Sequence, residues 1–134
     1  MKKIIVNGEG AIFGRICSFA AKKALEGNEV IILNSEKVII TGNKKDIISK
    51  YDRLRKKGGF SQKGPRILKA PDKLLKRAIR GMLPDFRRGQ GKEAFKKIRC
   101  YQNIPDNMVN EKMINISNVE KLKFIELKEL SDKI

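Results

Sequence analysis

The order of apolar runs in the first forty residues constrains the fold more than any other feature of this chain. Residues 2–7 contain a short apolar run and predict a buried strand. Residues 13–26 favour a helix, because apolar side chains recur at helical spacing and Gly27 follows as a stop signal. Residues 29–33 and 38–40 predict two further strands. A strand, a helix and a strand in this order imply a parallel pair joined by a right-handed crossover, and therefore an α/β fold.

Beyond residue 40, glycine and proline divide the chain into shorter elements. The expected elements are a helix over 44–57, a loop over 60–70, a helix starting at Pro71, a loop over 85–91, a helix over 92–97, a strand over 98–102 with Cys100 buried, a loop over 103–117, a strand or extended packing segment over 122–127, and a helical turn over 127–134. The apolar face of the helix from Pro71 is formed by Leu74, Leu75, Ala78, Ile79, Met82 and Leu83. The length suits one domain over 1–134.

Positive charge is concentrated in the middle of the chain. Residues 44–99 hold 20 Lys or Arg against 5 Asp or Glu, within a formal net charge of +16 for the whole chain. A surface that is merely solvated should mix the two signs, so this excess predicts a polyanionic partner, with nucleic acid as the obvious one. Aromatic residues are too few for a platform of stacked single-stranded bases, which favours recognition of structured RNA by shape and phosphate.

The composition excludes several kinds of chemistry. The chain has no histidine, so a Ser-His-Asp triad and any histidine-ligated metal are impossible. Two isolated cysteines, Cys17 and Cys100, cannot build a structural zinc site and are expected to be free thiols. No apolar run approaches the roughly 20 residues of a membrane span, and the start does not look like a signal peptide. These features predict a cytosolic chain without a membrane partner.

A glycine pattern lies between the first expected strand and helix. Gly8, Gly10 and Gly14 form a loosened version of the dinucleotide fingerprint. One interpretation is a cofactor pyrophosphate at the helix N-terminus, as in a small nucleotide-dependent enzyme. The other is a tight turn that needs small residues. Arg15, at the helix start, could bind an RNA phosphate or pair with a carboxylate.

Several motifs together resemble one known family. The strongest matches are Ile79-Arg80-Gly81-Met82-Leu83-Pro84, Gly91-Lys92 and Ile98-Arg99-Cys100-Tyr101, supported by Gly14-Arg15-Ile16-Cys17-Ser18, Asn34-Ser35-Glu36-Lys37 and Thr41-Gly42-Asn43. Their order and spacing, from about residue 7 to 105, resemble the archaeal and eukaryotic type of the large-subunit ribosomal protein thirteen family. Gln102-Asn103 stands where that family commonly has a glycine, and the tail over about 103–134 matches weakly.

The resemblance implies a three-layer α/β/α fold around a mostly parallel sheet of about four strands. It implies a structural constituent of the large ribosomal subunit in the cytoplasm, which binds ribosomal RNA, contacts neighbouring ribosomal proteins, and supports subunit assembly and translation. It implies no catalysis, no cofactor and no small-molecule substrate. A free regulatory RNA-binding protein outside the ribosome is the alternative from the residues alone.

The basic stretch, together with the resemblance, selects the residues expected to contact RNA. They are Arg15, Lys45, Arg53, Arg55, Lys56, Lys57, Lys63, Arg66, Lys69, Lys73, Arg77, Arg80, Arg87, Arg88, Lys92 and Lys96. On the third helix, Lys76 shares the basic face with Lys73, Arg77 and Arg80. The tail segment 122–127 could either pack on the body or contact a neighbouring protein.

Overall fold

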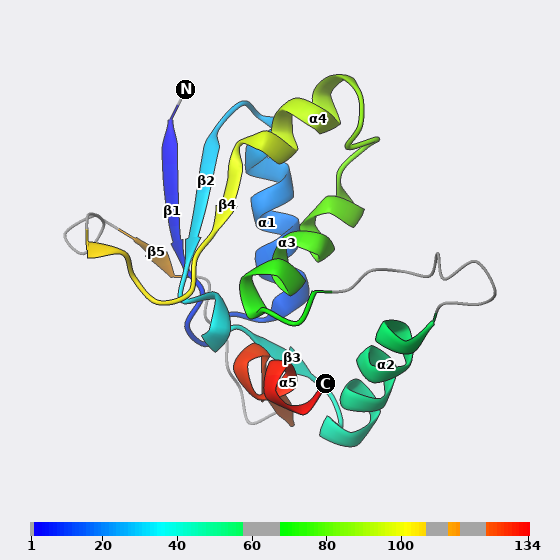
Figure 1. The fold of residues 1–134 in the computed structure, drawn as a ribbon. Helices are drawn as coiled ribbons and strands as arrows, with labels where there is room; N and C mark the ends of the chain where they lie inside the picture. The colour runs from blue at the N-terminus through cyan, green and yellow to red at the C-terminus, as the bar shows by residue number, and fades with distance from the viewer. Residues whose placement is uncertain (1, 58–67, 107–112, 116–122) are drawn as a thin grey trace.

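The computed structural model describes residues 2–57, 68–106, 113–115 and 123–134. Its elements, in chain order, are β1 (Lys3–Asn7), α1 (Phe13–Leu25), β2 (Glu29–Leu33), the 3-10 turn η1 (Ser35–Lys37), β3 (Ile39–Thr41), α2 (Lys44–Lys56), α3 (Pro71–Met82), α4 (Gly89–Lys96), β4 (Ile98–Cys100), β5 (Ile114–Asn115), β6 (Phe124–Glu126) and α5 (Leu127–Lys133). Figure 1 shows α1, α3 and α4 beside the strands, with α2 and α5 beyond one end of the sheet.

A parallel sheet forms the centre of the fold. Its strand order is β4-β2-β1-β5, and all three neighbouring pairs run parallel. β1 and β2 pair along their full length, from Lys3 with Glu29 to Asn7 with Leu33, with α1 as the crossover between them. The predicted α/β class, with helices around a mostly parallel sheet of four strands in a three-layer arrangement, is confirmed.

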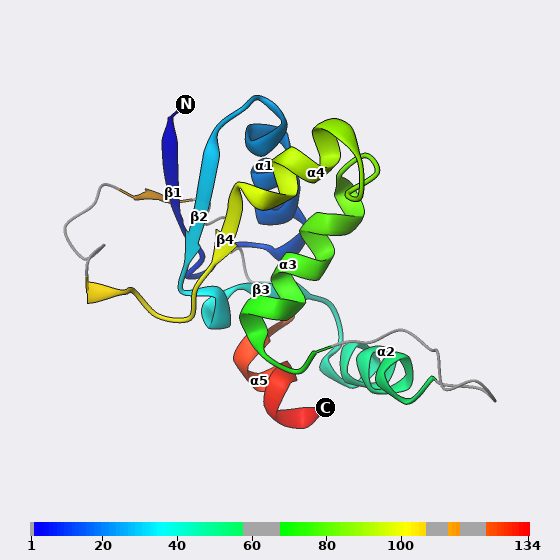
Figure 2. The same cartoon turned by 45° about the horizontal axis from the view of Figure 1, so that its top comes forward.

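One face of the sheet packs against helices and carries the main core. Val6, Val30 and Ile32 from the strands join Ile16 from α1 and Leu75 from α3 in one buried cluster. Turning the molecule shows α1, α3 and α4 on the same side of β1, β2 and β4 (Figure 2). Most of the apolar faces that helical spacing predicted for α1 and α3 are therefore buried against this face of the sheet.

The opposite face of the sheet carries a smaller cluster. Ile5, Ile31 and Leu33 are buried there, because alternate residues of a strand point to opposite faces. Partly buried side chains from the segments after β4 pack on them: Tyr101, Ile104 and Met113. The turn after β4 includes Asn103 with φ +58°, a backbone conformation that favours glycine.

The C-terminal tail is part of the main core. β6 pairs antiparallel with β3 in a separate two-stranded sheet. Ile125, Leu127 and Leu130 are completely buried in the same cluster as Ile16. Over residues 123–127 the predicted packing on the body is therefore found at Ile125 and Leu127, while Phe124 is 36% exposed. Leu122 lies outside the described residues.

In the glycine-rich turn after β1, the structure explains why Gly8 and Gly10 must be small. A Cβ on Gly8 would lie 2.8 Å from a Val38 methyl carbon and 2.9 Å from the Leu33 carbonyl oxygen, and the Gly8 N–H donates to that oxygen. Gly10 adopts φ +71°, a conformation that favours glycine. Close packing and turn geometry thus account for these two small residues.

The predicted start of α4 is wrong by three residues. The helix begins at Gly89, whereas the sequence indicated residue 92 and a loop over 85–91. The reason is tertiary: a Cβ on Gly91 would overlap the backbone carbonyl oxygens of Pro84 and Asp85. The first turn of α4 packs tightly on the end of the preceding segment, and only glycine permits this approach.

Three smaller expectations are also wrong. Met82 was expected on the apolar face of α3, but it is 46% exposed, because α3 ends there and Leu83 turns inward instead. The loop expected over 103–117 contains β5, whose residues Ile114 and Asn115 pair with β1. Cys100, expected to be buried, is only partly buried. Among the described residues, no helix has both the length and the apolar content needed to cross a membrane.

Candidate nucleic-acid interface

Helix α3 presents a basic face beside a buried one. Leu74, Leu75 and Ile79 are buried in the core, and Pro71 occupies the first turn, where its missing N–H costs nothing. The remaining circumference carries exposed Lys73 and partly buried cations at positions 76, 77 and 80. Burial of one side of the helix thus fixes the direction in which the cations point.

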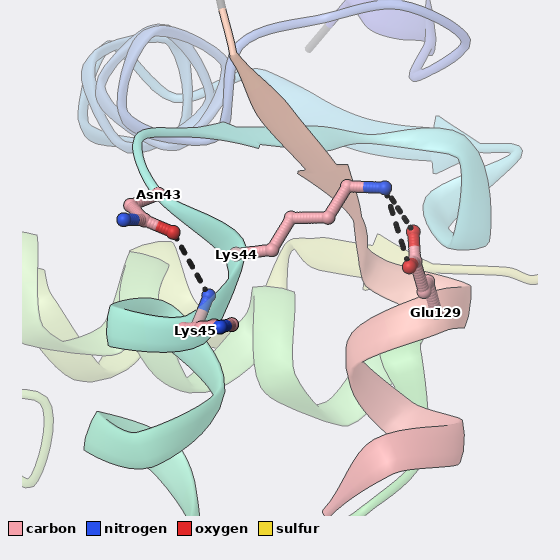
Figure 3. A network of polar contacts seen from close by, with 4 residues as sticks. All are labelled: Asn43, Lys44, Lys45 and Glu129. Carbon is pink, nitrogen blue, oxygen red and sulfur yellow. Dashed lines mark hydrogen bonds and ion pairs between the residues drawn. The ribbon is translucent and has the colours of Figure 1, made fainter.

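Helix α2 is held to the rest of the fold mainly through its first turn and one apolar stripe. The Asn43 side chain accepts a hydrogen bond from the Lys45 N–H at 3.2 Å and caps the helix (Figure 3). Lys44 forms an ion pair with Glu129 of α5. None of the residues of α2 is fully buried, although Tyr51 and Leu54 pack partly on the core. The helix is therefore a largely exposed carrier of charge.

A groove lies between α2 and α3. Its volume is about 290 Å³, with Tyr51, Leu54 and Leu74 among its apolar lining. Its cationic lining comprises Lys50, Arg77 and Arg80. Burial raises the pKa of Tyr51, Cys17 adds to this shift, and the positive charge of Arg77 acts in the opposite direction. Cations from two helices separated in sequence thus border one concave surface.

A second groove lies between α3 and α4. Its volume is about 180 Å³, and Leu68 and Phe95 supply its apolar lining. Four cations of α3 border it: Lys73, Lys76, Arg77 and Arg80. Arg77 and Arg80 line both grooves, so they form the cationic centre of the surface.

Aromatic rings support the cations at the α3–α4 junction. The Arg80 and Arg87 guanidinium carbons lie 4.7 and 5.3 Å from the centroid of the Phe86 ring. The Lys76 ammonium lies 5.1 Å from the Phe95 centroid, and the two rings are 6.0 Å apart. These distances are within the range of cation–π attraction.

The predicted RNA-contacting residues fall into four groups in the structure. Lys63 and Arg66 lie outside the described residues, and the other fourteen all have exposed or partly exposed side chains. The α2 group is Lys45, Arg53, Arg55, Lys56 and Lys57; the α3 group is Lys69, Lys73, Arg77 and Arg80; the α4 group is Arg87, Arg88, Lys92 and Lys96; Arg15 is on α1. Arg15 lines neither groove, and Lys92 borders a different hollow, together with Leu25 and Lys97.

The ion pairs found among the described residues involve few of the predicted contact residues. The ion pairs within the described parts of the chain are Lys23–Glu26, Lys44–Glu129 and Lys56–Asp52. Of the predicted contact residues, Lys56 alone takes part in these three pairs. A cation outside such a pair can bind an outside anion, which is what the sequence argument predicts for this surface.

Four residues of the surface were missed when contact residues were selected from the sequence. Lys50 and Lys76 line the grooves, and Phe86 and Phe95 carry the ring contacts. Helical spacing already placed Lys76 on the basic face of α3, so a signal existed for that residue. No sequence pattern indicated the role of Phe86 and Phe95, because contacts across the α3–α4 junction depend on how the two helices pack.

Cys17 and Cys100 are both free thiols, as expected. Burial raises the pKa of each thiol, to about 12 for Cys100, where Lys76 and Lys73 oppose the shift and Asp72 adds to it. No cluster of three or more metal-binding side chains occurs in the ranges that the structure describes.

Together, the fold and surface define a class: a small α/β protein that presents clustered cations from helices beside a parallel sheet. Residues 1–107 match the family Ribosomal protein L13, and this chain belongs to that family. The resemblance seen in the sequence motifs is thereby confirmed.

Curated relatives support this assignment along nearly the whole chain. Large ribosomal subunit protein uL13 of Methanocaldococcus jannaschii is 42% identical over 131 residues, covering 95% of this chain and 93% of the relative. The protein of the same name from Methanococcus maripaludis is 39% identical over 132 residues, with coverage of 96% and 94%. That of Thermoplasma acidophilum is 40% identical over 115 residues, with coverage of 86% and 83%.

Proposed function

We propose that this chain is a structural constituent of the large ribosomal subunit and binds its RNA through the basic surface of α2, α3 and α4. Family membership and the names of the relatives support the ribosomal role. The observation that carries the proposed binding surface is the placement of Arg77 and Arg80, which line both grooves at its centre. A ribosomal protein family implies a structural component, so we expect no enzymatic activity.

The physical role of the surface is phosphate neutralisation. Cations on rigid helices can hold phosphates of separate RNA segments close together, and counterion release then supplies affinity. Arginine suits this task, because its planar fork binds phosphate through two hydrogen bonds. The fourteen described contact residues, with Lys63 and Arg66, are therefore proposed to act together in subunit assembly.

A second surface, which shares Lys45 with the proposed RNA surface, has the mixed composition of a protein interface. A hollow of about 700 Å³ between the start of α2 and the tail is bordered by Lys44, Lys45 and Phe124 together with Glu126 and Glu129. Both charge signs and an exposed ring occur there, as is common at the rim of protein interfaces. We propose that neighbouring large-subunit proteins meet the chain here, at the ribosome in the cytoplasm.

We also propose that residues 1–134 form one domain. The buried tail residues Ile125, Leu127 and Leu130 share a hydrophobic cluster with Val6 and Ile16. A tail that folded separately would not need to complete the core of the body.

A salt titration of RNA binding tests the proposed contact surface. The double variant R77E/R80E should bind a large-subunit ribosomal RNA fragment more weakly than the unchanged protein. The slope of log affinity against log salt should become shallower by about two, one for each cation lost. The control K2E/K128E makes the same change in net charge at exposed positions outside the basic stretch and should behave like the unchanged protein.

The outcomes of this titration and of sedimentation are separable. Unchanged affinity of R77E/R80E across the salt range, with an unchanged circular dichroism spectrum, would contradict the proposed RNA surface. In sucrose gradients of cell extract, the chain should travel with the large subunit at stoichiometric yield. Sedimentation only as free protein would instead indicate a regulatory RNA-binding protein outside the ribosome.

A further inference from the structure

The cations of the surface differ in how firmly they are held. The side chains of Arg53, Arg55 and Lys57 make no hydrogen bond, ion pair or ring contact with any residue in the described ranges. At the α3–α4 junction, by contrast, Lys76, Arg80 and Arg87 lie over aromatic rings, at 4.7 to 5.3 Å from the ring centroids. An unsupported cation therefore loses more side-chain entropy when it binds a phosphate than a cation that is already held over a ring.

The segment that carries Phe86 is itself fixed. The Arg87 N–H donates to a carboxylate oxygen of Asp85 at 3.1 Å, and the Arg88 N–H donates to the Asp85 carbonyl oxygen at 3.2 Å. Gly91 packs against the backbone of Pro84 and Asp85. Phe86 therefore projects from an anchored turn. This turn also limits the movement of Arg80 and Arg87, which lie over the Phe86 ring.

We propose that Phe86 and Phe95 are positioning residues, which hold Lys76, Arg80 and Arg87 as a preformed site for closely spaced phosphates of folded RNA. This inference rests on the proposed RNA binding and specifies which part of the surface selects folded RNA over an extended strand. A fixed set of cations matches one fixed set of phosphates, whereas an extended strand must lose conformational entropy to fit it. By contrast, Arg53, Arg55 and Lys57 attract any RNA through charge alone.

Substitution of the ring separates positioning from charge. F86L removes the aromatic face but retains every positive charge. It should weaken binding of a folded ribosomal RNA fragment by about three- to tenfold, the range expected when cation–π contacts of this kind are lost. Binding of an unstructured single strand of equal length and the salt slope should both stay unchanged, because the number of neutralised phosphates is the same.

Three matched variants sharpen the test. F86Y keeps an aromatic face and should bind folded RNA like the unchanged protein. F19L makes the same substitution as F86L at a ring of α1 that also lies beneath a lysine, Lys23, outside the α3–α4 junction, and should have no effect. R87K retains the charge on an exposed side chain but loses the planar stacking group, so it should reproduce the selective loss seen in F86L.

Each result decides between the two proposals. The positioning role is overturned if F86L and R87K bind folded RNA normally, even where R77E/R80E still weakens binding and the proposed function stands. It is equally overturned if F86L weakens folded and unstructured RNA to the same extent or changes the salt slope, since the ring would then act as a general contact. If R77E/R80E instead binds RNA as tightly as the unchanged protein, the proposed RNA surface itself is contradicted.

Discussion

Lys44 Nζ lies 3.3 Å from both carboxylate oxygens of Glu129, so the first residue of α2 is joined to the C-terminal helix α5 (Figure 3). The two residues are 85 positions apart in sequence. Because α2 has no fully buried residue, this contact and the cap at Asn43 matter more for its placement than they would for a core helix. The tail therefore helps to orient a helix of the proposed RNA surface.

Removing the Glu129 charge should loosen α2 without unfolding the protein. The pair is exposed, with 54% and 38% of the two side chains accessible, so E129Q should lower the free energy of unfolding by less than about 1 kcal/mol. Hydrogen exchange should nevertheless accelerate in α2 and stay unchanged in α3, as measured by mass spectrometry. D132N, a neutralised exposed acid on the same helix, is the control. Equal exchange of α2 in E129Q and the unchanged protein would contradict the tethering role.

Alanine at Gly91 should destabilise the fold, whereas alanine at Gly81 should not. The added Cβ at Gly91 meets the carbonyl oxygens of Pro84 and Asp85, which are backbone atoms and cannot rotate away. G91A should therefore cost about 1–3 kcal/mol in chemical unfolding. At Gly81 nothing lies within 4 Å of the added Cβ, so G81A should stabilise the helix by up to about 1 kcal/mol. Similar unfolding midpoints for the two variants would show that α4 does not pack on this turn.

Truncation of a tail side chain should destabilise the whole molecule. Leu130 is fully inaccessible and lies in the main hydrophobic cluster. L130A should therefore lower the free energy of unfolding by about 2–5 kcal/mol, while K128A, at an exposed position of the same helix, should change it little. Urea unfolding followed by circular dichroism measures both. A small effect of L130A, or a separate early transition, would argue against one cooperative domain.

The two thiols should make the protein less stable in mild alkali. Burial raises the folded-state pKa of Cys17 and of Cys100, whereas an unfolded thiol ionises near pH 8.5. Below about pH 8 the thiols are protonated in both states and contribute no pH dependence. Between about pH 8.5 and 9.5 only the unfolded state loses protons, so each thiol lowers the free energy of unfolding by up to about 1.4 kcal/mol per pH unit.

Unfolding titrations at several pH values measure this slope. The double variant C17A/C100A should show a flatter dependence in the same window, whatever its absolute stability. In the folded protein at pH 8, both thiols should also react slowly with a disulfide reagent, and rapidly after denaturation, because the thiolate is the reactive form. A slope unchanged by the double substitution would show that the thiols do not cause it.

The elements near the N-terminus were predictable because their signals are local. A strand pattern, a helical period and a stop at Gly27 lie within the segments that form β1, α1 and β2, and the parallel pairing follows from their order. The start of α4 was not predictable in this way, since it depends on Gly91 meeting the backbone of Pro84 and Asp85. β5 has only two residues and exists through its pairing with Val6 and Asn7.

The sequence by itself determined the α/β class, the family, and the excess of cations on helices, because hydrophobic period, motif order and charge are all properties of neighbouring residues. Only the tertiary structure decided which cations act together. Arg77 and Arg80 share two grooves because α2 and α4 flank α3, and Arg80 is held over Phe86 because the turn after α3 folds back. Such neighbourhoods arise from packing between distant segments, which no local pattern of residues encodes.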